Sequence, residues 1–237
     1  MIRVVGVLLA LGALAWPTSA LAQEQGYRRG TIDSERLTGM AEVGLGWIVL
    51  PGAEVCVERT QAGCSSGDSS FELQAWQLFR MGALAVGAGL TLGLTPTTDA
   101  PRQDPPGVQR DHTRRYLTIE GTVRYYPFRD PDFEAWVGLT GGLVVVSDRF
   151  ESQEGRQEIE LVGPQGVTIR TEGYTVGVAV GAAWIFEPNW SLGASLRYGS
   201  WFLPSEPERD PLGDEASLSG QNSVFGLGLS IAYRVPL

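Results

Sequence analysis

The 237-residue chain contains no lysine, one histidine and two cysteines, and each scarcity excludes a class of protein. All 18 cationic residues are arginine and the acidic residues number 27, so the formal net charge is −9. A nucleic-acid-binding domain would be basic, and we therefore expect no nucleic-acid partner. Two cysteines are too few for a disulfide-rich scaffold, and 43% hydrophobic residues are too many for a disordered acidic chain.

Motifs that carry catalysis or hold cofactors are also missing. The sequence has no phosphate loop, no G-x-G-x-x-G, no His-Glu-x-x-His and no G-x-S-x-G. We therefore predict no cofactor, no metal site, no catalytic residue and no enzymatic activity.

Residues 1–22 have the features of a secretory signal peptide. Arg3 supplies the positive charge, residues 4–14 are apolar, and Ala20-Leu21-Ala22 forms a small-x-small cleavage site. A membrane anchor helix would need about 20 apolar residues, and Pro17 interrupts this run first. We predict that residues 1–22 are removed and that residues 23–39 form a periplasmic N-terminal segment.

The rest of the chain alternates with period two. Met81–Thr98 has no charge and could pass for a membrane helix, yet its even positions from 84 to 94 are mostly large and apolar and its odd positions are small. This alternation indicates a strand with two different faces. The same pattern predicts eight strands, at 40–49, 71–80, 84–94, 115–126, 135–146, 173–186, 190–201 and 222–235.

The connections between these segments alternate in length. Long connections (50–70, 95–114, 147–172 and 202–221) follow the odd-numbered strands, and short ones (81–83, 127–134 and 187–189) follow the even-numbered strands. Transmembrane barrels have long extracellular loops and short periplasmic turns, whereas a lipocalin-type barrel needs no such alternation. The sequence therefore predicts an all-β, eight-stranded antiparallel up-and-down transmembrane β-barrel over residues 40–237, with four long extracellular loops and three short periplasmic turns.

The charged residues within the strands fall on the face that carries the small residues. A lipid-facing wall must be almost free of charge, so these side chains are expected to point into the lumen. We define this lumen ionic cluster as Glu42, Glu72, Arg80, Glu120, Arg124, Arg197 and Arg234.

The spacing of the cluster along the strands predicts specific pairs. Glu42 is expected to lie between Arg80 and Arg234 near the periplasmic end, and Glu120 is expected to pair with Arg197 at mid-height. The remaining space is expected to be filled by large aromatic side chains, namely Trp76, Tyr116, Tyr126 and Trp136. The interior of an eight-stranded barrel is just wide enough for side chains to fill it, so this lumen is expected to be closed.

Outward-facing aromatic residues gather at the strand ends, as expected at the two membrane interfaces. The predicted periplasmic girdle is Phe79, Tyr125, Trp184, Phe186, Trp190 and Tyr233. The predicted outer girdle is Trp47, Phe71, Tyr174, Tyr198, Phe202 and Phe225.

The first long loop contains both cysteines, Cys56 and Cys64. In an oxidising compartment the pair is expected to form a disulfide that contributes about 2 to 3 kcal/mol through loop closure.

The long loops carry nearly all of the net negative charge. The acid-rich segment 148–160 is the first place to look for bound divalent cations or basic partners, although it lacks the residue order of a calcium loop. The only histidine, His112, lies in the second long loop, so a His-Ser-Glu lipid-modifying site is the least favoured alternative.

In its strand pattern, residues 40–237 resemble the small bacterial outer-membrane β-barrels, the OmpA-like and OmpX-like group. The resemblance implies an outer-membrane location with periplasmic termini and contact with membrane lipid. It also implies recognition of the last strand, Phe225–Leu237, by the barrel assembly machinery, although such strands usually end in Phe rather than Leu. The leading expectation is a non-enzymatic surface protein whose loops serve interaction, adhesion or envelope integrity, with an unknown extracellular partner. The alternative is a narrow transport or permeation barrel for small or apolar solutes.

Overall fold

The computed structural model describes residues 37–56, 64–95, 98–99, 110–152, 166–209 and 215–237. The predicted signal peptide lies outside the described residues, as does most of the segment 23–39. The described residues contain no helix long and apolar enough to cross a membrane. Their strands are β1 (Thr38–Cys56), β2 (Cys64–Met81), β3 (Leu84–Leu94), β4 (Thr98–Asp99), β5 (Arg110–Arg129), β6 (Phe133–Ser152), β7 (Gly166–Glu187), β8 (Trp190–Phe202) and β9 (Gln221–Pro236).

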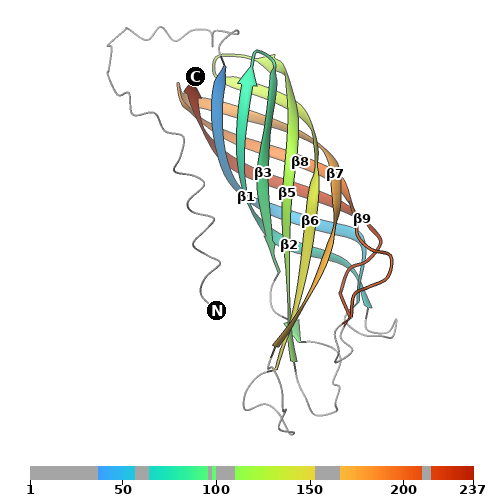
Figure 1. Ribbon diagram of the computed structural model, residues 1–237. Coiled ribbons are helices and arrows are strands. Elements are labelled where there is room, and N and C mark those ends of the chain that lie inside the picture. The colour runs from blue at the N-terminus through green and yellow to red at the C-terminus, as the bar shows by residue number, and fades with distance from the viewer. Residues whose placement is uncertain (1–36, 57–63, 96–97, 100–109, 153–165, 210–214) are drawn as a thin grey trace.

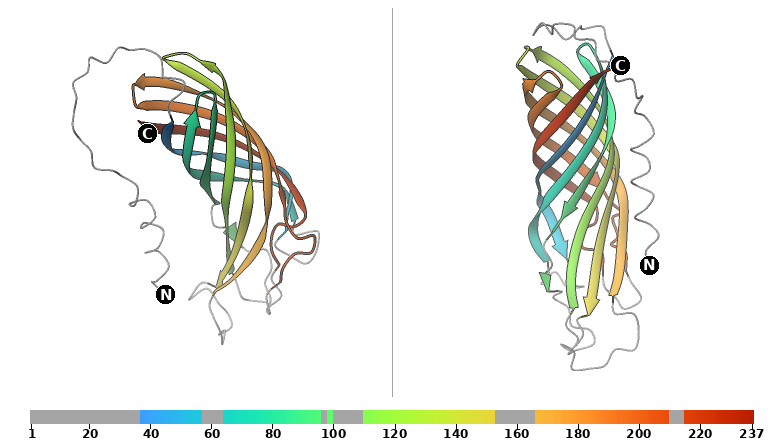
Figure 2. Two further views of the ribbon diagram at one scale, coloured as in Figure 1. Left: turned by 45° about the horizontal axis from the view of Figure 1, so that its top comes forward. Right: turned by 90° about the vertical axis from the view of Figure 1, so that its left-hand side faces the viewer.

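Eight long antiparallel strands form a closed ring, with the two-residue β4 added beside β5 (Figures 1 and 2). The first and last strands pair along most of their length, from Thr38↔Pro236 to Val49↔Phe225. Pairing of β3 with β5 closes the other side of the ring. The predicted eight-stranded antiparallel barrel is therefore confirmed, and it begins at Thr38 rather than at residue 40.

Burial alternates along each strand as the period-two pattern predicts. On β7, Val176, Val178 and Val180 are about half exposed, whereas Thr175 and Ala179 face inward and are buried. The outer wall is thus apolar, and the charged and small residues of the strands lie inside, together with large aromatic and aliphatic side chains. This polarity is the reverse of that of a water-soluble barrel.

The short turns after β2 and β7 agree with the sequence analysis to within a residue, but the predicted turn 127–134 is only 130–132, and the long loops are wrong in extent. β1 continues to Cys56 and β6 to Ser152, while β7 already begins at Gly166. The predicted loops 50–70, 95–114 and 147–172 are therefore partly strand. These extensions alternate polar residues outward with buried ones inward, as Arg149 and Phe150 do. The outward side of a strand is apolar only as far as the strand contacts lipid. Because the strands continue beyond that point with polar outward residues, the apolar pattern predicts strand ends that are too early.

Candidate functional site

Eight charged side chains within the barrel wall form ion pairs in three layers along the lumen. Four are acidic (Glu42, Glu72, Glu120 and Glu134) and four are arginines (Arg80, Arg124, Arg197 and Arg234), and all but Arg197 are buried. The charges of these eight side chains therefore balance. Buried charges are costly unless paired, and here every one has a partner of opposite sign.

The layer nearest the short turns is centred on Glu134 of β6. Its carboxylate, fully buried, lies 2.7 Å from Arg80 Nη1 and 2.8 Å from Arg234 Nη2. Arg80 also donates to the carbonyl of Gly82 and lies over the ring of Tyr126, with 4.1 Å from its Cζ to the ring centroid. One carboxylate therefore does lie between two guanidinium groups at this end of the barrel.

That carboxylate is not the one predicted, because Glu42 does not lie between Arg80 and Arg234. The register places Arg80 opposite Thr38 and Arg234 opposite Met40, so both arginines lie nearer the short-turn end of the barrel than Glu42. Glu134 was missed because it falls within the predicted turn 127–134, whereas β6 already begins at Phe133. Its parity with Trp136 and Gly138, both inward on the same strand, was the available signal.

The middle layer joins Glu42 to Arg124, at 2.8 Å. The guanidinium of Arg124 also lies between two indoles, 4.1 Å from the ring centroid of Trp136 and 5.5 Å from that of Trp76. Glycines make room for both indoles, because a Cβ on Gly89 would meet Trp76 at 2.3 Å and one on Gly181 would meet Trp136 at 2.5 Å.

The third layer places Arg197 between Glu72 and Glu120, with each nitrogen–oxygen distance 3.0 Å. Thr175 donates to the other oxygen of Glu120 at 3.4 Å. The predicted proximity of Glu120 and Arg197 is present, and Glu72 adds a second acceptor that the sequence analysis did not pair.

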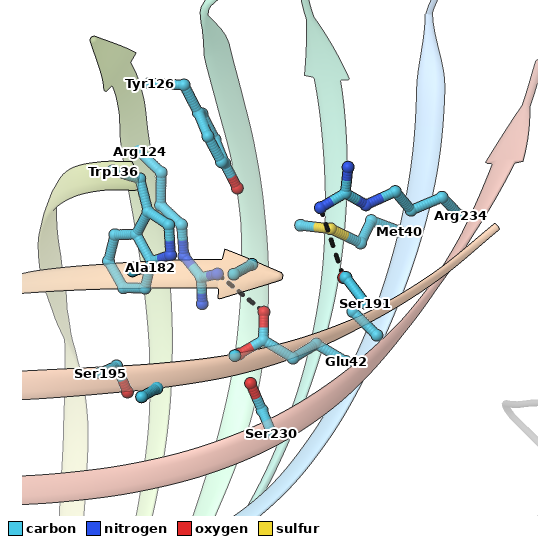
Figure 3. A pocket seen from close by; sticks show the side chains of 14 residues that line it. Met40, Glu42, Arg124, Tyr126, Trp136, Ala182, Ser191, Ser195, Ser230 and Arg234 are labelled. Carbon is cyan, nitrogen blue, oxygen red and sulfur yellow. Dashed lines mark hydrogen bonds and ion pairs between the residues drawn. The ribbon is translucent and has the colours of Figure 1, made fainter. Parts of the chain in front are cut away.

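Two cavities remain between these layers. One is a small cavity between the Glu134 layer and the Glu42 layer, where Met40, Ser191 and Ser230 face the ion pairs (Figure 3). The other is a small cavity between the Glu42 layer and Arg197. Arg124, Trp136 and Ser195 line both cavities, so the middle layer is the partition between them.

An apolar cluster fills the barrel on the side of the third layer that faces away from the short turns. Its members come from the halves of several strands that are far from the short turns and from the connection 203–220: Ile48, Leu50, Ala53, Tyr116, Val144, Val146, Trp201, Leu203, Leu218 and Val224. Leu218 is 1% exposed, so the last connection reaches into the mouth of the barrel rather than lying over it. Its ends are fixed by the hydrogen bond from the Leu203 amide to the carbonyl of Gly220, 2.9 Å long.

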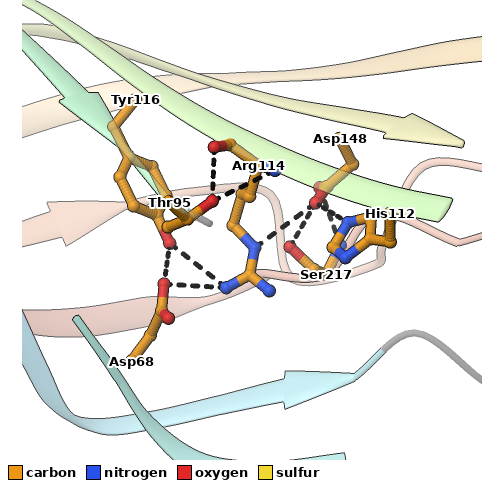
Figure 4. A network of polar contacts seen from close by, with 7 residues as sticks. All are labelled: Asp68, Thr95, His112, Arg114, Tyr116, Asp148 and Ser217. Atoms are coloured by element: carbon orange, nitrogen blue, oxygen red, sulfur yellow. Dashed lines mark hydrogen bonds and ion pairs between the residues drawn. The ribbon is translucent and has the colours of Figure 1, made fainter. Parts of the chain in front are cut away.

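A polar network lies beyond this cluster and fastens the connection 203–220 to the wall (Figure 4). Asp148 accepts hydrogen bonds from the amide and the hydroxyl of Ser217, at 2.9 Å and 2.6 Å, and contacts His112 Nε2 at 2.7 Å. Arg114 lies between two carboxylates: its Nε is 3.4 Å from Asp148 Oδ1 and its Nη1 is 2.7 Å from Asp68 Oδ2. The hydroxyl of Tyr116 also donates to Asp68.

Asp148 lies outside the membrane-spanning part of β6, since it pairs with Ile169, which precedes Tyr174 of the outer girdle. Burial by itself would raise the pKa of Asp148, but hydrogen bonds from His112 and Ser217 and the charge of Arg114 outweigh it and lower the pKa below its ordinary value. Two sequence interpretations are corrected here. His112 is a buried residue of β5 stacked on Phe150, and Asp148 is a buried acceptor rather than an exposed loop ligand.

The order of groups in this network differs from that of a nucleophile and its base. Asp148 lies between His112 and Ser217, so the serine hydroxyl donates to the carboxylate and not to the imidazole. Among the residues that the structure describes, no group of three or more His, Cys, Asp or Glu side chains is arranged to hold a metal ion. The remainder of the acidic segment, 153–165, lies outside the described residues.

The aromatic girdle residues lie on the outer wall, the predicted periplasmic ones near the strand ends and Trp47, Phe71 and Tyr174 well inside their strands. Eleven of the twelve are exposed, from 37% for Phe71 to 67% for Tyr174, and Tyr233 is half-buried against Trp190 with ring centroids 4.8 Å apart. The backbone register places Cys56 opposite Cys64 across β1 and β2. The side chains of these two cysteines lie outside the description, so the disulfide stays a prediction.

Comparison with solved structures identifies the fold. A major outer membrane protein from Thermus thermophilus aligns with a TM-score of 0.56 and 17% identity, over 84% of this chain and 99% of that one. Neisserial surface protein A aligns at a TM-score of 0.48 and 12% identity, over 83% and 96%. Ail of Yersinia pestis aligns with a TM-score of 0.45 and 12% identity, over 85% of this chain and 99% of that one. No family model and no curated protein sequence matches the chain.

Proposed function

We propose that this chain, whose fold is that of the small eight-stranded outer-membrane β-barrels, resides in a bacterial outer membrane as a closed, non-enzymatic barrel. It exposes its extracellular strands and loops for interaction, adhesion or envelope integrity. Its lipid-facing wall and its two aromatic girdles support contact with membrane lipid.

The observation that carries the proposal is the closure of the lumen. Three layers of ion pairs are followed by an apolar cluster that includes Leu218 of the last connection. A solute passing through would have to separate buried opposite charges and then displace a packed apolar core. A barrel closed in this way is better suited to present a surface than to conduct.

Planar-bilayer recording and liposome swelling test the closure. Purified wild-type protein is expected to give no steady channels and no swelling with small sugars. Large, steady wild-type channels would refute the proposal.

The surface role needs a separate test in cells. A deletion strain should lose adhesion or envelope integrity, measured as binding to surfaces and as leakage of a periplasmic enzyme. Wild-type protein should restore the lost property, whereas a chain with residues 153–165 replaced by a short turn should fold and fail to restore it. Full restoration by the shortened chain would argue that the barrel, not this loop, carries the function.

A narrow transport barrel is the second candidate, and the two lumen cavities favour it. Arg124 and Trp136 line both, so withdrawal of one of these side chains would join the two cavities. Sparse, brief openings of the wild type that become steady in Arg124→Ala would favour this candidate.

The last strand supports the proposed assembly route and orientation. β9 completes the ring by pairing with β1, which makes it the natural point of recognition by the assembly machinery. β1 begins and β9 ends at the end of the barrel that carries the short turns (Figure 1), and we place that end in the periplasm. Protease added outside intact cells should then leave a C-terminal epitope tag uncut.

A further inference from the structure

The outer wall carries two unpaired arginines at the extracellular edge of the apolar belt. Arg115 of β5 and Arg170 of β7 face outward and are exposed, and neither has an ion pair or side-chain hydrogen bond within the described residues. Ser147 of β6 lies between them, because Arg115 pairs with Ser147 and Ser147 pairs with Arg170. Figure 1 shows these three strands side by side.

The row lies directly beside the lipid-facing surface. One step toward the membrane on β5 is Leu117, which is 38% exposed on the apolar wall, the corresponding residue on β6 is Val145, and that on β7 is Glu172. The two guanidiniums are therefore held at the level where a lipid headgroup would meet the wall. Neighbouring strands are about 4.8 Å apart, so Arg115 and Arg170 are separated by about 10 Å at the backbone, within reach of two long side chains that converge on one group.

We propose that Arg115, Ser147 and Arg170 form a clamp for the phosphate of an outer-leaflet lipid headgroup. Guanidinium binds phosphate through two parallel N–H bonds, and the serine hydroxyl supplies a further donor at the centre of the row. The inference rests on the proposed outer-membrane location. It adds a specific lipid contact that the closed barrel does not require.

The neighbouring charges define how selective the clamp is. Arg149, one step farther from the membrane, is already paired with Glu151 at 2.9 Å and is not counted in it. Glu172 lies two residues from Arg170 on the same face and opposes an incoming phosphate. Removal of that carboxylate should therefore tighten binding.

Urea unfolding in lipid vesicles tests the clamp. The full chain is refolded into vesicles of dilauroylphosphatidylcholine, with or without one part in five of dilauroylphosphatidic acid, at low salt. The wild-type unfolding midpoint, followed by tryptophan fluorescence, should rise with the phosphatidic acid, and 0.5 M salt should abolish the rise because salt screens exposed charges.

The variants locate the effect. Arg115→Gln and Arg170→Gln should each lose most of the rise and the double variant all of it, while Arg115→Lys and Arg170→Lys should keep part. Glu172→Gln should enlarge the rise. The matched control is Arg129→Gln, because Arg129 is exposed at the periplasmic end of the same strand and should keep the wild-type rise.

Three results would overturn the proposal. These are no rise in the wild type, an equal rise in the double variant and in Arg129→Gln, or the same rise produced by inorganic phosphate in phosphatidylcholine vesicles alone. The last would assign the site to a free anion. None of these results depends on conductance, so failure of the clamp and failure of the closed barrel can be distinguished.

Discussion

Replacing Glu134 with glutamine should be among the most destabilising single changes in the lumen. Glu134 is fully buried and its two oxygens contact Arg80 at 2.7 Å and Arg234 at 2.8 Å. Both arginines are only 6% exposed, so loss of the carboxylate leaves two buried guanidiniums with no anion in their layer. Removing one partner of a buried ion pair costs about 3 to 5 kcal/mol.

The assay is equilibrium urea unfolding in phosphatidylcholine vesicles, followed by tryptophan fluorescence. With a denaturant slope of about 1 to 3 kcal/mol per molar urea, the midpoint should fall by about 1 M or more. The matched control is Glu151→Gln, which removes a carboxylate that is half exposed and paired with the half-exposed Arg149. Exposed pairs contribute only about 0 to 1 kcal/mol, so this variant should stay close to the wild type.

A double variant separates loss of charge from loss of shape. Glu134→Gln with Arg234→Gln restores the layer to one net positive charge, the wild-type value, and should recover part of the lost stability. The reasoning is refuted if Glu134→Gln costs no more than Glu151→Gln, or if the double variant is less stable by the full sum of the two single changes. Either result would mean that water reaches the layer and screens its charges.

Four further predictions follow from other parts of the barrel. Glu42→Ala should leave Arg124 without its carboxylate, lower stability and raise bilayer conductance, and identical conductance with unchanged stability would count against closure by this layer. The wild-type unfolding free energy should fall as the pH drops through and below about 4, because the lowered pKa of Asp148 stabilises the fold only while the carboxylate is ionised. The Asp148→Asn variant should have a lower unfolding free energy than the wild type at pH 7 and should lose this part of the pH dependence. Non-reducing mass mapping should join the Cys56 and Cys64 peptides, and alkylation of both without reduction would contradict the disulfide. Purified protein should give a β-type circular dichroism spectrum and migrate faster on gels before boiling than after.

The wall of the barrel could be predicted from the order of residues alone. Side chains alternate between two faces of a strand whatever the neighbouring strands are, so the period-two pattern was sufficient to separate lipid-facing residues such as Val176 and Val178 from inward residues such as Thr175. The alternation of long and short connections indicated the antiparallel order of strands. For the same reason the pattern predicted which charges point into the lumen, although not Glu134, which fell within the predicted turn 127–134.

Which inward charges meet became clear only from the folded barrel, because that depends on register around a closed ring. A shift of one pair of residues along a strand changes the partner of every side chain it carries. Glu42 therefore meets Arg124 of β5 rather than the arginines of its neighbours β2 and β9. The network around Asp148 is of the same kind, since it joins β5, β6 and the connection 203–220 across 69 residues between Asp148 and Ser217. Contacts across the barrel bring together residues that are distant in the chain, and no local periodicity encodes that distance.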